Sequence, residues 1–435
     1  MKVSAWLRPV VCIAVALVLA GGTVSTTAFA ADKKDKKEEK NEYPNATRKE
    51  PKLEMSAGTQ KDVNKALDLL NAGQGDEAKP IVDKVKDDPK ASKYAHALAL
   101  QAEGQIAYDK QDYAGAIQWF RQAYDADALP NNQHFSLLYT IAQLQIQEEK
   151  YQDALNTLDE FQKASGGSPK PDPYALQANA YYRLEKFQQA VDAMKKALSM
   201  TTDVKDSWLQ ILMASYAELE QYDEAAKVIE QQLAKAPNDM HLIRQAATVY
   251  IKGKQDQRAI DLLASAKQKG LVKSEEDYKL IAQLYDQADK PKEAAAALNE
   301  GFTSGAVKPS YDMYKLLGDS YALAQDDAKA IDAYAKASPF AKDGNVDYVR
   351  GSLLLNNDRA KEAVDALNQA VTKGSLKQPG EAYIILGDAY NNLDNAASAR
   401  AAWQKAKGYP STQKMAEQRL SAGKVHTAPV KTKKQ

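Results

Sequence analysis

The fold of this chain is decided by a phrase that recurs along it. Residues 314–337 read YKLLGDSYALAQDDAKAIDAYAKA, and residues 383–406 read YIILGDAYNNLDNAASARAAWQKA. Both copies carry glycine at the fifth position, tyrosine at the eighth, alanine at the seventeenth and last, and a large aromatic residue at the twenty-first. These offsets place the small and large residues on the facing sides of two consecutive helices.

The alanine at the seventeenth position of the phrase recurs ten times, at intervals of 33 to 38 residues. A unit of this length made of two helices cannot bury its apolar face alone, so neighbouring units must stack around a continuous core. We therefore predict an all-α solenoid of about ten helix-turn-helix repeats. The structural repeat positions are Ala78, Ala116, Ala154, Ala190, Ala225, Ala259, Ala294, Ala330, Ala363 and Ala399.

Other positions of the phrase are nearly as regular. A small residue stands twelve positions before the repeat alanine in nine of the ten units, with Met213 as the exception. We expect the two helices of one unit to cross there, small residue against small residue. A bulky residue four positions after the alanine and a tyrosine nine positions before it, such as Tyr321 or Tyr390, are expected in the seam between adjacent units.

This pattern resembles the tetratricopeptide repeat family over about residues 59 to 409. The family signature is matched in order by Tyr314, Gly318, Tyr321, Ala330, Tyr334 and Ala337. The resemblance implies a right-handed superhelix whose first helices line a concave surface. The closing proline of the family pattern stands in place only at Pro237, and the period drifts above 34 residues, so the local superhelix geometry can differ from the family's.

The first 30 residues have the layout of a cleaved signal peptide. Lys2 and Arg8 precede an apolar stretch, and the segment ends in Ala-Phe-Ala before Ala31. The apolar stretch is shorter than the roughly 20 residues that span a bilayer, so cleavage is favoured over an uncleaved anchor. Cys12 is the only cysteine, and the mature chain is expected to have neither a thiol nor a membrane span.

Composition divides the rest of the chain. Residues 31–55 are dense in Lys, Glu and Asp and are predicted to form a disordered linker. Residues 56–409 form the repeat array, residues 410–422 are expected to form a C-terminal capping helix, and the basic residues 423–435 a disordered tail. The region from Met55 to Ser421 holds 44 basic and 51 acidic residues, a balance that argues against nucleic-acid binding.

The sequence lacks the common catalytic, phosphate-binding and metal-binding motifs. It has no nucleophile elbow, no phosphate-binding glycine loop and no histidine pair at helical metal-site spacing. Acidic pairs such as Asp326-Asp327 stand where helices begin, as solvated caps do. We expect no enzyme activity, no metal and no cofactor.

The concave face is the candidate partner-binding site. By the family resemblance, the second, fifth, ninth and twelfth positions of the first helix in each unit project from it. The face is expected to be polar, with basic residues followed by acidic ones, which suits an extended or helical peptide. The candidates are Tyr139, Gln143, Asn179, Tyr182, His241, Arg244, Thr248, Lys279, Gln283, Asp286, Asp312, Lys315 and Asp319.

The later phrases, such as LLGDSY from Leu316, look like those of exported tetratricopeptide proteins that accompany TonB, ExbB and ExbD in Gram-negative bacteria. That resemblance implies a non-enzymatic periplasmic scaffold that binds TonB, ExbD or an outer-membrane receptor. The alternative is a scaffold for exopolysaccharide or cell-envelope assembly, in which the ligand is a glycan or a secretion protein. A cofactor or lytic enzyme for peptidoglycan is a third possibility, which the lack of an acid/base constellation in the sequence disfavours. The oligomeric state is left open.

Overall fold

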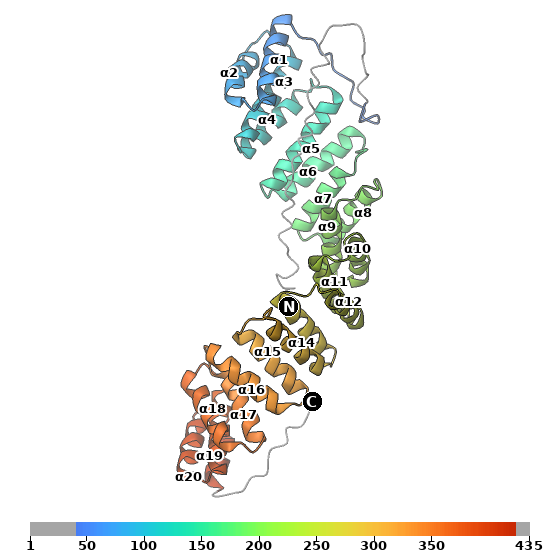
Figure 1. Ribbon diagram of the computed structural model, residues 1–435. Helices are drawn as coiled ribbons and strands as arrows, with labels where there is room; N and C mark the ends of the chain where they lie inside the picture. Colours follow the sequence, from blue (N-terminus) through green and yellow to red (C-terminus); the bar gives the residue numbers. More distant parts are fainter. Residues whose placement is uncertain (1–40, 423–435) are drawn as a thin grey trace. The chain divides into compact units, whose positions relative to one another are not determined.

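The computed structural model describes residues 41–422, and within them it is all helical, with 21 α-helices and no strand (Figure 1). The helices are α1 Ala57–Asn71, α2 Gly75–Lys86, α3 Lys93–Asp109, α4 Tyr113–Asp125, α5 Asn131–Gln147, α6 Tyr151–Ser165, α7 Asp172–Arg183, α8 Phe187–Leu198, α9 Asp206–Glu218, α10 Tyr222–Lys235, α11 Met240–Lys252, α12 Asp256–Gln268, α13 Glu275–Gln287, α14 Pro291–Ser304, α15 Tyr311–Leu323, α16 Asp327–Ala337, α17 Asn345–Asn356, α18 Ala360–Lys373, α19 Pro379–Asn392, α20 Ala396–Lys407 and α21 Gln413–Ser421. A 3₁₀ turn, η2, covers Ser338–Phe340.

The chain forms two compact units, which the sequence pattern did not predict. Unit 1 ends at Lys235 with α10, and unit 2 begins at Ala236. The division falls in the short loop that contains Pro237, before α11. Within each unit, consecutive helices pair and each pair packs on the next, as stacked repeats do.

The predicted helix-turn-helix repeats are confirmed. Each of the ten repeat alanines lies in the second helix of a pair, from Ala78 in α2 to Ala399 in α20, and each is fully buried. A residue as small as alanine fits there because the helices on either side approach closely.

At Gly318 and Gly387, the small residue twelve positions before the alanine has a different nearest neighbour from the one expected. A Cβ added to Gly318 would lie 2.5 Å from the ring of Tyr334, the bulky residue of the same unit. Gly387 meets Trp403 in the same way, at 2.3 Å. In these units the glycine therefore packs against the bulky residue of the same unit, whose side chain fills the space above the glycine.

The tyrosine of the phrase lies in the seam between units, as predicted. The amide of Asn299 in α14 donates to the hydroxyl of Tyr321 in α15 at 2.7 Å, and Asn368 in α18 donates to Tyr390 in α19 at 3.0 Å. Both hydrogen bonds join one repeat to the next. They also satisfy hydroxyl groups that are partly removed from water.

The turn inside every repeat has a left-handed residue five positions before the repeat alanine. The first is Gly73, with φ +73°, and the other nine are not glycine, as with Gln111 at φ +62° and Gln325 at φ +60°. This conformation disfavours residues with a Cβ. Packing of the two helices therefore holds each turn in a conformation that is costly by itself.

Of the segments predicted at the two ends of the chain, the structure describes the capping helix and part of the linker. Helix α21 lies within the range predicted for a capping helix, and Arg419 donates two hydrogen bonds to Asp388 of α19, at 2.9 and 3.1 Å. The predicted signal peptide, residues 31–40 of the predicted linker and the predicted tail lie outside the described residues.

Residues 41–50, which we call the N-terminal strap, correct the prediction of a disordered linker. Tyr43 is only 6% exposed because its ring packs against Phe135 of α5 and Phe161 of α6. The strap runs along unit 1 and continues through residues 51–56 into α1 (Figure 1). The segment is rich in charged residues, but its one buried aromatic residue, Tyr43, contacts Phe135, about 90 residues further along the chain.

Candidate functional site

The candidate face of unit 2 is carried by α11, α13 and α15. Arg244 of α11 donates to the carboxylate of Asp277 in α13 at 2.7 Å. Burial pushes the pKa of Asp277 up, but the hydrogen bonds from Arg244 and from the backbone N–H groups of Ser274 and Lys273 outweigh it and leave the pKa below its usual value. Arg244 therefore joins two neighbouring repeats. Its positive charge, which was expected to be available to a partner on the concave face, is neutralised by Asp277.

The acidic end of this face is also partly engaged in the fold. Ser320 of α15 donates to Asp286 of α13 at 2.7 Å. Asp319 accepts from the Tyr334 hydroxyl at 2.9 Å and pairs with Lys315 at 2.6 Å. Burial, and then the nearby charge of Asp319, raise the pKa of Asp286 although the Ser320 hydroxyl opposes the shift.

The remaining candidates of unit 2 are accessible. His241, Gln283 and Asp312 are exposed on α11, α13 and α15, and Lys279 is half-buried on α13. Thr248 donates its hydroxyl to the backbone carbonyl of Arg244. A partner that docks on this face would meet the three exposed side chains first.

Two of the four candidates of unit 1 are buried and two are half-buried. Gln143 of α5 and Asn179 of α7 are 7% and 4% exposed. Tyr139 is half-buried, and burial raises its pKa. Tyr182 is half-buried against Phe187, with ring centroids 5.7 Å apart. Gln143 and Asn179 are therefore part of the buried interior, whereas Tyr139 and Tyr182 each keep a partly exposed side.

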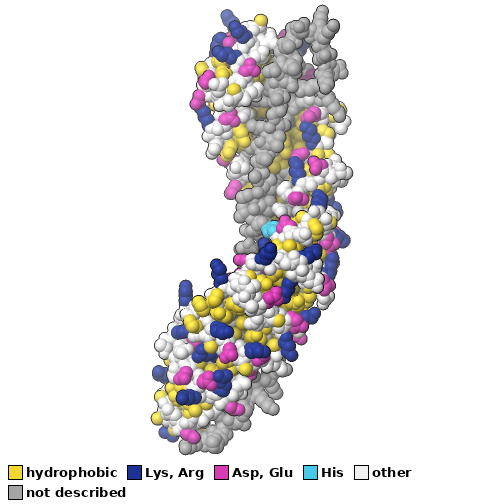
Figure 2. All heavy atoms as spheres, viewed as in Figure 1, with side chains coloured by type: hydrophobic (Ala, Val, Ile, Leu, Met, Phe, Trp, Pro, Cys, Tyr) yellow, Lys and Arg dark blue, Asp and Glu magenta, His cyan; other side chains and the backbone are white. Residues whose placement is uncertain are grey.

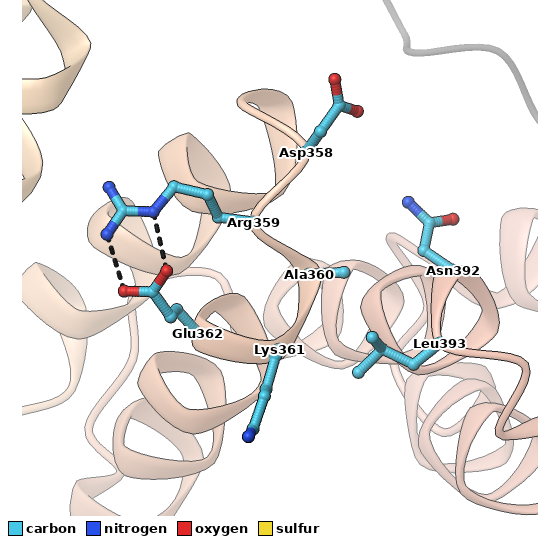
Figure 3. A pocket seen from close by; sticks show the side chains of 7 residues that line it. All are labelled: Asp358, Arg359, Ala360, Lys361, Glu362, Asn392 and Leu393. Carbon is cyan, nitrogen blue, oxygen red and sulfur yellow. Dashed lines mark hydrogen bonds and ion pairs between the residues drawn. The ribbon is translucent and has the colours of Figure 1, made fainter.

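A shallow pocket of about 520 Å³ lies in unit 2, where the turn before α18 meets the end of α19 (Figure 3). Arg359 and Glu362 point toward each other there and form two hydrogen bonds, at 2.8 and 2.6 Å. Arg359 and Glu362 thus neutralise each other, and Asp358 and Lys361 are the other charged residues that line the pocket. The repeat pattern of the sequence does not mark these residues.

Hydrophobic side chains gather on the part of unit 2 around α15 (Figure 2). Leu323, at the end of α15, is 61% exposed, and Phe340 of η2 is 47% exposed. Phe302, Tyr314 and Phe340 form an aromatic row with ring centroids 4.7 and 6.2 Å apart. Apolar surface of this kind is frequent where proteins bind each other.

No group of three or more His, Cys, Asp or Glu side chains in residues 41–422 is placed to hold a metal ion. In the same range, none of the helices has the length and apolarity needed to cross a bilayer.

Comparison with known proteins identifies the repeats. Tetratricopeptide repeat family profiles match residues 63–132, 171–203, 280–345 and 348–411, which together are more than half of the chain. Proteins with these repeats bind protein partners.

Curated relatives match over a short stretch. Interferon-induced protein with tetratricopeptide repeats 2 is 33% identical over 110 residues in Cricetulus griseus and 32% over 115 residues in Homo sapiens. These matches cover 24% of this chain and 23% and 24% of the relatives. The chain thus spans about a quarter of the length of the curated relatives it matches.

Solved structures of tetratricopeptide proteins match this chain at low identity and with TM-scores below 0.5. The C-terminal part of a tetratricopeptide protein from Cytophaga hutchinsonii is 14% identical, with a TM-score of 0.44, over 65% of this chain and 99% of that one. YrrB, described as a tetratricopeptide protein with an unusual peptide-binding site, is 19% identical with a TM-score of 0.37, over 46% of this chain and all of that one. The family profiles and the ten helix pairs lead to one conclusion: this chain belongs to the tetratricopeptide repeat family.

Proposed function

We propose that this protein is a non-enzymatic scaffold that binds a protein partner on the first helices of unit 2, in the periplasm of a Gram-negative bacterium. The observation that carries the proposal is the accessible polar face of α11, α13 and α15 beside exposed apolar groups. His241, Gln283 and Asp312 are exposed there, and Leu323 is exposed at the end of α15. Such a mixture of polar and apolar groups suits a peptide or helix of a partner.

We further propose that the partner belongs to a TonB, ExbB and ExbD energy-transduction system, with TonB, ExbD or an outer-membrane receptor as the bound protein. The support is the phrasing of the repeats and the layout of residues 1–30, which is that of an export signal. An exported scaffold for exopolysaccharide or envelope assembly is the second candidate, favoured by the aromatic row of Phe302, Tyr314 and Phe340, because aromatic rings also stack on sugars.

Affinity capture tests the proposal. The chain from Ala31 onward is immobilised and exposed to periplasmic and outer-membrane extract of its own bacterium, and bound proteins are identified by mass spectrometry. We expect TonB, ExbD or a receptor to be retained, and Asp312→Lys to weaken that binding. Asp332→Lys, exposed on the second helix of the same repeat, serves as the control. Capture of envelope-assembly proteins alone would replace the first assignment with the second.

A further inference from the structure

The N-terminal strap occupies an aromatic socket on unit 1. The ring of Tyr43 meets Phe135 of α5 and Phe161 of α6 edge to face, with centroids 5.1 and 5.9 Å apart. Phe135, Phe161 and the neighbouring Leu138 are all nearly inaccessible to water. An aromatic side chain in a pocket of this kind is the usual energetic centre of a peptide-binding site.

A polar clamp holds the C-terminal end of the strap. The Arg48 guanidinium donates to Asp127 at 2.5 Å and to the side-chain oxygen of Asn131 at 2.6 Å. The Glu50 carboxylate accepts from the backbone N–H of Asn131, the first residue of α5, at 3.1 Å. Pro130 provides no side-chain cap for α5, so the strap supplies the negative charge that the helix N-terminus favours.

The N-terminal end of the strap is held by a second set of contacts. Lys170 donates to Glu42 at 2.8 Å, and the backbone N–H of Glu42 donates to Asn132 at 3.0 Å. The loop after α6 admits the strap because residue 166 is glycine: a Cβ there would lie 2.4 Å from the backbone oxygen of Asn45. The surface of unit 1 therefore fits the extended strap in three ways: by apolar contacts, by ion pairs and by the space that Gly166 leaves open.

The strap has the properties of a bound ligand. It has no helix or strand of its own, and each of the hydrogen bonds named above has a side chain on at least one side. Its attachment to α1 through residues 51–56 keeps it near the socket, at an effective concentration that reaches about millimolar for short flexible linkers. A docked segment of this kind can be exchanged for a second one of the same chemistry.

We propose that the socket of α5 and α6 is a peptide-binding site and that the strap is its tethered occupant. The partner it fits is an extended protein segment with an aromatic residue followed five positions later by arginine, as Tyr43 is followed by Arg48. The inference rests on the proposed scaffold function and adds a second binding surface, distinct from the face of unit 2.

A competition experiment tests this proposal. A fluorescent peptide of residues 41–52 is titrated by anisotropy against the full chain and against its Tyr43→Asp variant. The variant empties the socket, so we expect micromolar binding to it and at least tenfold weaker binding to the unaltered chain. The same peptide carrying Tyr43→Asp should not bind either protein. Circular dichroism establishes that the variant keeps its helices.

Two glycines of one loop provide matched controls. In the Tyr43→Asp background, Gly166→Ala should abolish peptide binding because its Cβ would meet the peptide backbone. Gly167→Ala should retain binding, since a Cβ there has nothing within 4 Å and both positions have positive φ. Equal binding by the unaltered chain and Tyr43→Asp, or no binding by a helical Tyr43→Asp, overturns the proposal. Binding of a partner protein to the face of unit 2 is measured separately, by the affinity capture described above. A negative result for peptide binding to the socket is therefore distinguishable from a negative result for the scaffold function.

Discussion

At the scale of single residues, the fold depends on glycines that lie under bulky side chains. We expect Gly318→Ala to lower the free energy of unfolding by about 1–3 kcal/mol, because its Cβ would press into the Tyr334 ring. Gly58→Ala in α1 is the control: its Cβ has only an ordinary contact at 4.0 Å, so the change should be neutral or stabilising. Urea unfolding of both variants measures the difference, and equal stability would refute the proposed packing.

His134 makes the stability of unit 1 depend on pH. Burial lowers its pKa to about 4, the charge of Arg48 adds to this shift, and the charge of Asp127 opposes it. Its ring also stacks on Tyr124 at 4.2 Å. The unfolded chain, with an ordinary pKa of about 6.5, binds more protons between pH 6.5 and 4. The contribution of neutral His134 to the free energy of unfolding is therefore present in full above pH 6.5. It is lost as the pH falls toward 4, and the loss amounts to at most about 3 kcal/mol.

Denaturant unfolding across pH 4 to 7.5 checks this prediction. His134→Gln should flatten the dependence over that window. The control is His241→Gln, because His241 is exposed on α11, and this variant should leave the profile unchanged. An unaltered slope in His134→Gln would show that other groups cause the acid sensitivity.

At the scale of the helix pair, the left-handed turns are the strained elements. Gln111→Gly should raise stability by about 0.5–1 kcal/mol, because relief of the Cβ strain exceeds the added entropy of the unfolded chain. Gln118→Gly, exposed in the middle of α4, should lower stability by about 1 kcal/mol. Thermal melting of the two variants should therefore shift in opposite directions, and a downward shift for both would contradict the turn geometry.

The helix pairs could be predicted from the sequence because their signal repeats. The alanine recurs ten times, so chance variation at one unit, such as Met213, does not hide the period. The partner of Arg244 was missed, although Asp277 stands one repeat length further along and opposite charges at that spacing could have indicated the pair. The candidate face was predicted from position alone, so it included Gln143 and Asn179, which the helix packing buries.

The strap could not be predicted, because a docked segment has no period. Its composition is that of a disordered linker, and only one residue, Tyr43, carries most of the apolar contact. The socket is completed by Phe161, 118 positions later in the chain, and nothing local to either segment indicates that they meet.

In the molecule as a whole, the repeats of one unit share their stability with their neighbours. The most direct measurement is amide hydrogen exchange of Ala330→Leu, a substitution that overpacks a fully buried position of α16. Ala328→Leu, exposed on the same helix, is the control. We expect faster exchange in α15, α16 and the adjoining α14 and α17, with no change in the control. Exchange in Ala330→Leu that matches the unaltered protein throughout these helices would contradict the interlocked packing of the repeats.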